Sequence, residues 1–317
     1  MPRSGPARRF CRSGRRLRAV ILPLVTVCSL PALLHAQSLE PRLLSPAPVG
    51  MNFLVAGYVY SSGNMILDDA LPLEDTKARA HSLTVVYVRS INLFGQSGRV
   101  SAILPFADGR WTAEIDGRDS STVRTGLSDP MVSIGVGLYG APAMRAAEFA
   151  TFRPRTMVGA GLRVRLPLGQ YDDTKLFNLS THRWQFIPSV GAAQYVGRWV
   201  LEAHLRAWFS TTNNDFFGGN SVAQDPLFGF QLHAEYIFGP GFWGAVSFGQ
   251  SYGGATTVDG VKQDNRQSNN RFGLTLAVPL YRVWALKGGY YTGISTRYGG
   301  DFDTFALALQ YRWGGMK

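Results

Sequence analysis

The sequence predicts an all-β protein, an antiparallel, up-and-down transmembrane β-barrel of about twelve strands. Three observations favour this class. Many segments alternate between apolar and polar residues with a period of two, as strands do. The 317 residues include 36 Gly, 19 Phe, 13 Tyr and 7 Trp but only 17% charged residues, a composition typical of many strands joined by turns. No segment offers the roughly 18 uncharged apolar residues that a membrane-spanning helix needs.

Residues 1–36 have the pattern of a signal peptide. Seven arginines and no acidic residue precede an apolar run over residues 19–34, and the stretch LLHAQS places a cleavage point after Ala36. Pro23 and Pro31 interrupt the apolar run, which favours a cleaved signal over a membrane anchor. We therefore expect export from the cytoplasm, to the bacterial outer membrane.

Removal of the signal peptide changes two properties of the chain. The formal charge falls from +11 to about +4, because 25 basic residues remain against 21 acidic ones, and nucleic-acid binding loses its support. Both cysteines, Cys11 and Cys28, also leave. The mature chain then has no thiol for a disulfide framework, a thiolate metal site or thiol catalysis.

Residues 37–50, QSLEPRLLSPAPVG, are a Pro-rich periplasmic lead-in without any period, and residues 51–317 form the barrel. Most predicted strands match the roughly 9–11 residues of a tilted membrane strand. Residues 141–154 are the one place with room for a short helix. The strands are predicted over 51–61, 79–91, 97–106, 128–139, 155–168, 184–196, 198–211, 226–238, 241–252, 268–281, 283–295 and 303–313.

Four strands separate cleanly into two faces. Strand 303–313 places Phe305, Leu307, Leu309, Tyr311 and Trp313 on one face and Thr304, Ala306, Ala308, Gln310 and Arg312 on the other. Strands 155–168, 198–211 and 226–238 likewise oppose apolar rows to rows of Arg, Glu, His and Gln. Burial of these charged rows in a soluble sandwich would cost several kcal/mol per unpaired charge, whereas a water-filled lumen removes that cost. Strands 79–91, 184–196 and 241–252 alternate too weakly to assign a face.

The connections alternate in length, which is typical of an outer-membrane barrel with short periplasmic turns and long outside loops. The connections after the second, sixth, eighth and tenth strands are short, and residues 140–154 form a longer periplasmic turn. Both ends of the barrel chain then lie on the periplasmic side. The aromatic residues at strand ends are predicted to form interfacial girdles. These residues are Trp199, Trp208, Trp243, Trp284, Tyr311 and Trp313.

Several stretches resemble the outer-membrane channel family of the meta-pathway of phenol degradation. They include SPAPVGMNFLVAGY, GLSDPMVSIGVGLYGAPA, LPLGQYDDTKLFNLSTHRWQF and YYTGISTRYGGDFDTFALALQYRW, and the resemblance covers essentially the whole mature chain. It implies a transporter-like barrel in bacteria that degrade aromatic compounds. It therefore implies passive uptake of small molecules, aromatic or hydrophobic ones in particular.

The polar faces supply the candidate residues that line the lumen and contact a solute. An excess of Arg favours solutes with a carboxylate or phenolate. Equally, the charges can pair with one another and fill a narrow bore, which would give a structural or solute-indifferent barrel. The candidates are Arg163, Arg165, Glu202, His204, Arg206, Gln231, His233, Glu235, Arg271, Lys287, Gln310 and Arg312.

Catalytic and cofactor signals are weak. No cofactor or metal site is predicted, and His204 and His233 are interpreted as hydrogen-bonded lumen residues rather than metal ligands. An outer-membrane lipid hydrolase would need a Ser and a His on the lipid-facing wall, but these two histidines fall on the polar face. The expected partners are outer-membrane lipid, lipopolysaccharide, the barrel assembly machinery and a small solute, without nucleic acid. The oligomeric state is left open.

Overall fold

A computed structural model describes residues 39–66, 74–115 and 117–315. The predicted signal peptide lies outside these residues. Within the described ranges, no helix combines the length and the apolar character needed to cross a membrane.

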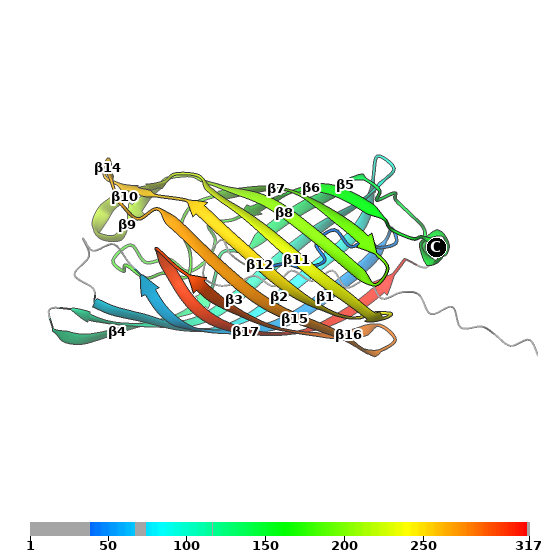
Figure 1. Ribbon diagram of the computed structural model, residues 1–317. Coiled ribbons are helices and arrows are strands. Elements are labelled where there is room, and N and C mark those ends of the chain that lie inside the picture. Colours follow the sequence, from blue (N-terminus) through cyan, green and yellow to red (C-terminus); the bar gives the residue numbers. More distant parts are fainter. Residues whose placement is uncertain (1–38, 67–73, 116, 316–317) are drawn as a thin grey trace, which may run out of the picture.

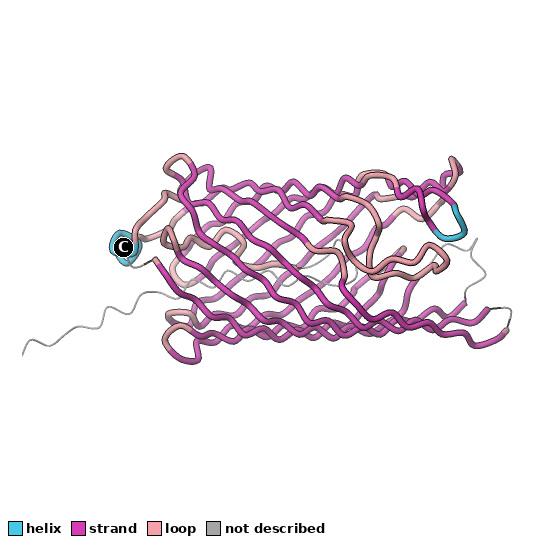
Figure 2. Tube along the Cα trace, turned by 180° about the vertical axis from the view of Figure 1, so that it is seen from behind, coloured by secondary structure: helices cyan, strands magenta, loops and turns pink. Residues whose placement is uncertain are grey.

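The wall is a closed antiparallel sheet whose strands are tilted across the barrel (Figures 1 and 2). β1 pairs with β17 from Met51 opposite Gly314 to Ile66 opposite Gly299, which closes the sheet. β4 and β5 both pair with β3, so they share one of twelve wall positions. The wall strands are β1 Met51–Ile66, β2 Glu74–Leu93, β3 Gln96–Ile115, β4 Arg118–Leu127, β5 Met131–Tyr139, β6 Thr156–Arg165, β7 Gln185–Val196, β8 Trp199–Ser210, β11 Leu227–Gly239, β12 Phe242–Gly253, β15 Gln267–Tyr281, β16 Trp284–Ser295 and β17 Gly299–Gly314.

The predicted all-β barrel is confirmed, but several of its strands are longer than predicted. β3 continues nine residues beyond the predicted end at residue 106 and pairs there with β4, which was not predicted. A second small sheet, in the order β14-β13-β10-β9, lies at the same end of the barrel (Figure 1). Its strands are β9 Asn213–Phe216, β10 Asn220–Gln224, β13 Thr256–Val258 and β14 Val261–Lys262, and the 3-10 turn η1 Phe217–Gly219 joins two of them. β4 and the four strands of the small sheet lack a continuous apolar face because they extend beyond the membrane layer. Their sequences therefore show no alternation of apolar and polar residues.

Side chains alternate between an exposed outer face and a buried inner face. On β17 the outer row contains Phe305 and Leu307, both more than half exposed, whereas Ala306 and Ala308 of the inner row are buried. β2, which had no assigned face, carries Ser82, Thr84 and Val86 inward and Leu83 and Val85 outward. The outer face is therefore apolar and suited to lipid, while the inner face mixes small and polar residues with buried apolar ones such as Phe53 and Val55.

The outward aromatic residues gather near the strand ends, as expected of an interfacial girdle. Trp284 packs on Tyr311 with ring centroids 4.8 Å apart, and Tyr311 stacks on Trp313 at 5.5 Å. The prediction was wrong for two tryptophans. Trp208 and Trp243 have the same parity as Arg206 and Ser247, and they lie buried on the inner face.

The two ends of the barrel differ in structure. Tight turns join β2 to β3, β7 to β8, β11 to β12 and β15 to β16 at the end where the C-terminus lies (Figure 1), which we identify as the periplasmic end. At this end the predicted short helix is confirmed as α1 Ala146–Thr151, within the long turn between β5 and β6. Its Phe149 is buried, and the backbone N–H of Val49 donates to the carbonyl of Met144 at 2.8 Å. This turn therefore folds against the chain that precedes β1.

Candidate functional site

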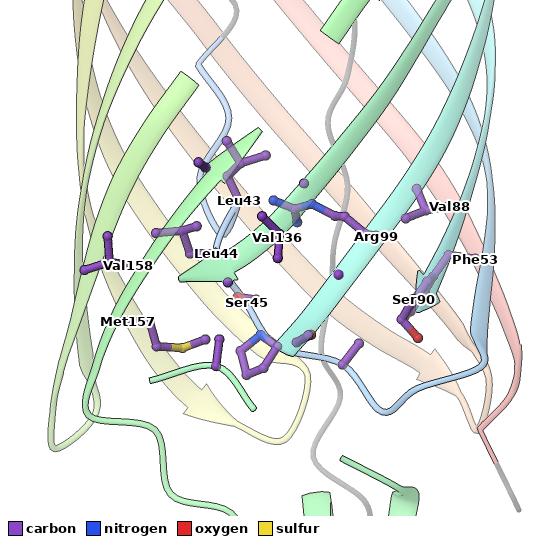
Figure 3. Close-up of a pocket in the computed structure, with 18 residues that line it drawn as sticks. Leu43, Leu44, Ser45, Phe53, Val88, Ser90, Arg99, Val136, Met157 and Val158 are labelled. Atoms are coloured by element: carbon purple, nitrogen blue, oxygen red, sulfur yellow. The ribbon is translucent and has the colours of Figure 1, made fainter. Parts of the chain in front are cut away.

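Residues 39–50, which precede β1, lie inside the barrel, and we call them the inner segment. Leu39, Glu40, Arg42 and Ser45 are buried although they belong to no strand. Figure 3 shows Leu43, Leu44 and Ser45 within the wall, near Val136 of β5 and Met157 and Val158 of β6. The predicted lead-in therefore occupies the lumen from Leu39 onward.

Glu40 joins the inner segment to two arginines of the wall. Arg163 of β6 donates from both terminal nitrogens, Nη1 to Oε1 at 2.9 Å and Nη2 to Oε2 at 3.1 Å. Arg206 of β8 donates from Nη2 to Oε2 at 2.8 Å. The Glu40 side chain is 1% exposed, so both partners bind a carboxylate that water does not reach. The backbone N–H of Glu40 donates to Oε1 of Gln231 on β11 at 3.3 Å.

A second group of contacts holds the next turn of the inner segment. Glu235 of β11 accepts from the Arg42 backbone N–H at 2.8 Å and from Arg42 Nη1 at 3.0 Å. The Arg42 guanidinium also lies 5.4 Å from the ring centre of Trp243 on β12, within cation–π range. Glu202 of β8 accepts from the backbone N–H of Leu43 at 3.2 Å. Glu202 and Glu235 thus each bind a group of the inner segment.

The two lumen histidines belong to the same polar network. Nε2 of His204 lies 3.1 Å from Oε2 of Glu202, and Nδ1 of His233 lies 2.8 Å from Oγ of Ser247. The two imidazole rings are 5.7 Å apart. Among the described residues no group of three His, Cys, Asp or Glu side chains is arranged to hold a metal ion.

The structure brings seven of the twelve candidate residues together around the inner segment. They are Arg163, Glu202, His204, Arg206, Gln231, His233 and Glu235.

The other five candidates lie elsewhere. Arg165 lies nearer the outer end of β6, and buried Arg271 of β15 donates to the carbonyl of Phe302 at 2.9 Å. Lys287 and Gln310 are buried on β16 and β17. Arg312 is at the periplasmic end, where its Nη2 donates to the carbonyl of Arg282 in the turn between β15 and β16.

Three charged residues near the centre escaped the prediction. Glu40 and Arg42 stand in a segment without a period, so no pattern places their side chains. Arg99 on β3 lines both cavities described below, and it has no salt bridge within 4.0 Å to any residue that the structure describes. Its parity with Ser101 and Ile103 could have placed it on the inner face.

Two cavities border the inner segment, each of about 50 Å³. Leu43, Leu44 and Arg99 line both of them. Ligand pockets usually measure roughly 300–1,000 Å³, so neither cavity admits an aromatic solute. The inner segment must shift before such a solute can pass at this level.

The outer mouth is narrowed by the loop between β6 and β7, residues 166–184. Phe177 of this loop stacks on inward-facing Trp111 of β3, with ring centroids 5.5 Å apart and planes 9° apart. Asp129 holds the loop by accepting from the Thr181 backbone N–H at 2.9 Å and hydroxyl at 3.0 Å. Burial lowers the pKa of Arg183 in this loop to about 10, so it remains charged at neutral pH. The mouth therefore combines flat aromatic surfaces with positive charge.

A closed twelve-stranded barrel with an apolar outer face and a charged interior is a transmembrane β-barrel of the bacterial outer membrane. The chain belongs to the family described as "Putative MetA-pathway of phenol degradation", whose profile matches residues 61–310. No curated protein matches the sequence.

The chain is similar to several solved structures, and the first of them shares its fold. An outer-membrane channel from Pseudomonas putida F1 is 20% identical with a TM-score of 0.73, covering 87% of this chain and 100% of its own. The transport unit of the autotransporter AIDA-I from Escherichia coli is 10% identical with a TM-score of 0.48, covering 83% of this chain and 90% of its own. The KdgM porin in complex with disordered oligogalacturonate is 8% identical with a TM-score of 0.40, covering 81% and 98%.

Proposed function

We propose that the protein is an outer-membrane channel for the passive uptake of small molecules, aromatic acids and phenols in particular. The observation that carries this proposal is the set of buried arginines and acids inside the barrel, which contact a short segment of the chain instead of one another across the lumen. Channels conduct through weak successive contacts, which such side chains can supply. The description of the family, which refers to phenol degradation, supports the aromatic class.

The outer mouth supports the same solute class. A planar aromatic solute can stack on Trp111 in place of Phe177, since the two rings already lie face to face. Arg165 and Arg183 offer positive charge near this level, which favours a carboxylate or phenolate over a neutral solute. The outer face of the barrel would contact outer-membrane lipid. Lipopolysaccharide and the barrel assembly machinery are further expected partners.

The test is solute flux into liposomes that contain only the purified protein. We expect benzoate to enter faster than benzamide of nearly the same size, and faster than a pentose. Arg165→Gln should reduce the preference for benzoate over benzamide, because it removes a charge near the mouth. In cells, deletion of the gene should slow growth on an aromatic acid at low but not at high external concentration.

A second candidate function is a solute-indifferent or structural barrel. The two cavities of about 50 Å³ favour it, since the lumen is nearly filled at the inner segment. Equal flux of benzoate, benzamide and pentose, unchanged by Arg165→Gln, would indicate an unspecific pore. Absence of any flux would favour a structural role.

A lipid hydrolase has less support. His204 and His233 are buried on the inner face, away from lipid. On the outer face, Nδ1 of His81 lies 2.7 Å from the hydroxyl of Tyr58, and its ring packs on Tyr60. The structural neighbours named above include a channel and a porin, and neither description refers to an enzyme.

A further inference from the structure

Glu40 occupies a site built to bind a carboxylate. Arg163 grips both of its oxygens with a planar fork, and Arg206 adds a third charge-assisted hydrogen bond. This is the geometry by which arginine recognises free carboxylates. Both arginines come from wall strands, β6 and β8, so the barrel holds the site while the inner segment only fills it.

The wall leaves room beside this site. β7 lies between β6 and β8, and there it presents Ser189 and Gly191 to the lumen. Ser189 is opposite Arg206 on one side and Gly161 on the other. The cavity of about 50 Å³ lined by these small residues adjoins Arg163 and Arg206, and Arg99 reaches it from β3. Three arginines therefore line this cavity, and two of them bind the Glu40 carboxylate.

The charges are ordered along the lumen. β8 runs from the periplasmic end towards the outer end and places Glu202 first, then His204, then Arg206. β11 runs the opposite way and places Gln231 first and Glu235 four residues nearer the periplasm. An anion that comes from outside therefore meets Arg163 and Arg206 before it meets Glu202 and Glu235.

We propose that a solute carboxylate competes with Glu40 for Arg163 and Arg206, and that this exchange releases the inner segment. The solute would thereby open its own path. A solute carboxylate would take the place of Glu40 in the ion pairs of both arginines, so no buried charge is left unpaired. A neutral solute that displaced Glu40 would leave both arginines without a counter-ion. This inference rests on the proposed channel function and specifies its solute class as small monocarboxylates.

The first experiment measures benzoate binding to the full mature chain, refolded in detergent, by calorimetry. Glu40→Gln removes the internal competitor, and we expect it to bind benzoate at least tenfold more tightly than the natural chain. Glu40→Asp, a shorter competitor, should lie between them. Adding Arg163→Gln to Glu40→Gln should abolish the gain, and benzamide should bind alike to all variants that fold. Equal benzoate affinity with and without Glu40, or an equal gain for benzamide, would overturn the proposal.

The second experiment follows release of the inner segment. The mature chain has no cysteine, so Leu44→Cys gives a single thiol beside the cavity. In the Leu44→Cys variant that retains Glu40, benzoate should speed the reaction of the thiol with a polar maleimide several-fold, whereas benzamide should not. In the Glu40→Gln background the reaction should be fast without benzoate. A rate that ignores benzoate would contradict the proposal.

The two experiments need no transport, so they separate the inference from the proposed function. Benzoate flux with benzoate-independent labelling would leave the channel standing and overturn the competition with Glu40. Competition at Glu40 without any flux would overturn the channel and retain the carboxylate site.

Discussion

Arg42 shows how single residues hold the inner segment in place. It is one of the few non-glycine residues with a left-handed backbone, at φ 66°. That conformation costs an L-residue about 1–2 kcal/mol. The carboxylate of Glu235 offsets this cost because it accepts from both the backbone and the guanidinium of Arg42. The segment is therefore docked by specific charged contacts rather than by apolar packing alone.

We predict strong coupling between Arg42 and Glu235. Removal of one partner from a buried pair leaves an unpaired charge and costs about 3–5 kcal/mol, whereas removal of both costs less. Arg42→Gln and Glu235→Gln should each lower the free energy of unfolding by more than half of the loss in the double variant. Each single change should also release the inner segment. Urea titration in vesicles, with the Leu44→Cys labelling rate as a second readout, measures this. Simple additivity of the two changes would argue against the pair.

We also predict that Gly191 tolerates no side chain. A Cβ at this position would collide with Nδ1 of the buried His204 ring. Overpacking of this kind typically costs about 1–3 kcal/mol. Gly191→Ala should lower the urea midpoint accordingly, while Gly288→Ala should not, because the nearest atom to its Cβ is 4.0 Å away. Equal midpoints for the two variants would show that His204 yields without cost.

At this scale the sequence predicted the wall residues better than their partners. Glu202, His204 and Arg206 follow a period of two, so their common face could be predicted. Glu40 could not be matched to Arg163 and Arg206, which are 123 and 166 residues away, because nothing in a short aperiodic segment encodes such a contact. Solute contact by the candidate residues remains a proposal.

At the scale of elements, the membrane is what makes strands predictable. Within the lipid layer one face must be apolar, and there the predicted strands agree with β6, β7 and β8 to within a few residues. β4 stands outside it and exposes polar side chains, so it was missed. The far half of β3 carries buried Ala107 and Trp111 inward, but its outer face presents Arg110 and Thr112 instead of an apolar row, so the predicted strand ended at residue 106. The inner segment and the loop at 166–184 were not predicted inside the lumen, because their positions depend on tertiary contacts that no local pattern encodes.

The outer face of β6 and β8 gives a direct prediction. Leu162 and Leu205 point outward, at 40% and 60% exposure in the absence of lipid. Leu162→Arg or Leu205→Arg should destabilise folding into lipid by about 2–4 kcal/mol near the midplane, because the charge enters hydrocarbon. Leu205→Phe is the matched control and should be nearly neutral. Folding yields in vesicles against urea measure the difference. Silent arginine variants would reverse the assignment of the two faces.

At the scale of the whole molecule, closure of the sheet by β1 and β17 predicts behaviour during isolation. The mature protein should fractionate with the outer membrane. Unheated, it should migrate faster on a denaturing gel than after boiling, because a closed barrel resists detergent and stays compact. Recovery from the soluble periplasm, with identical migration before and after boiling, would contradict the fold.

The position of the inner segment also constrains how the molecule assembles. It directly precedes β1, and β1 must find β17 at the far end of the chain, along sixteen residue pairs. Contacts so distant in sequence form slowly. We therefore expect the β1–β17 seam to close last, around the inner segment, so that Glu40 is in place as a counter-ion when the arginines of the lumen are dehydrated. In the Glu40→Gln variant the barrel would have to close around Arg163 and Arg206 without their counter-ion. Assembly of this variant should therefore depend on dissolved anions, whereas the unaltered chain carries Glu40 as its own anion.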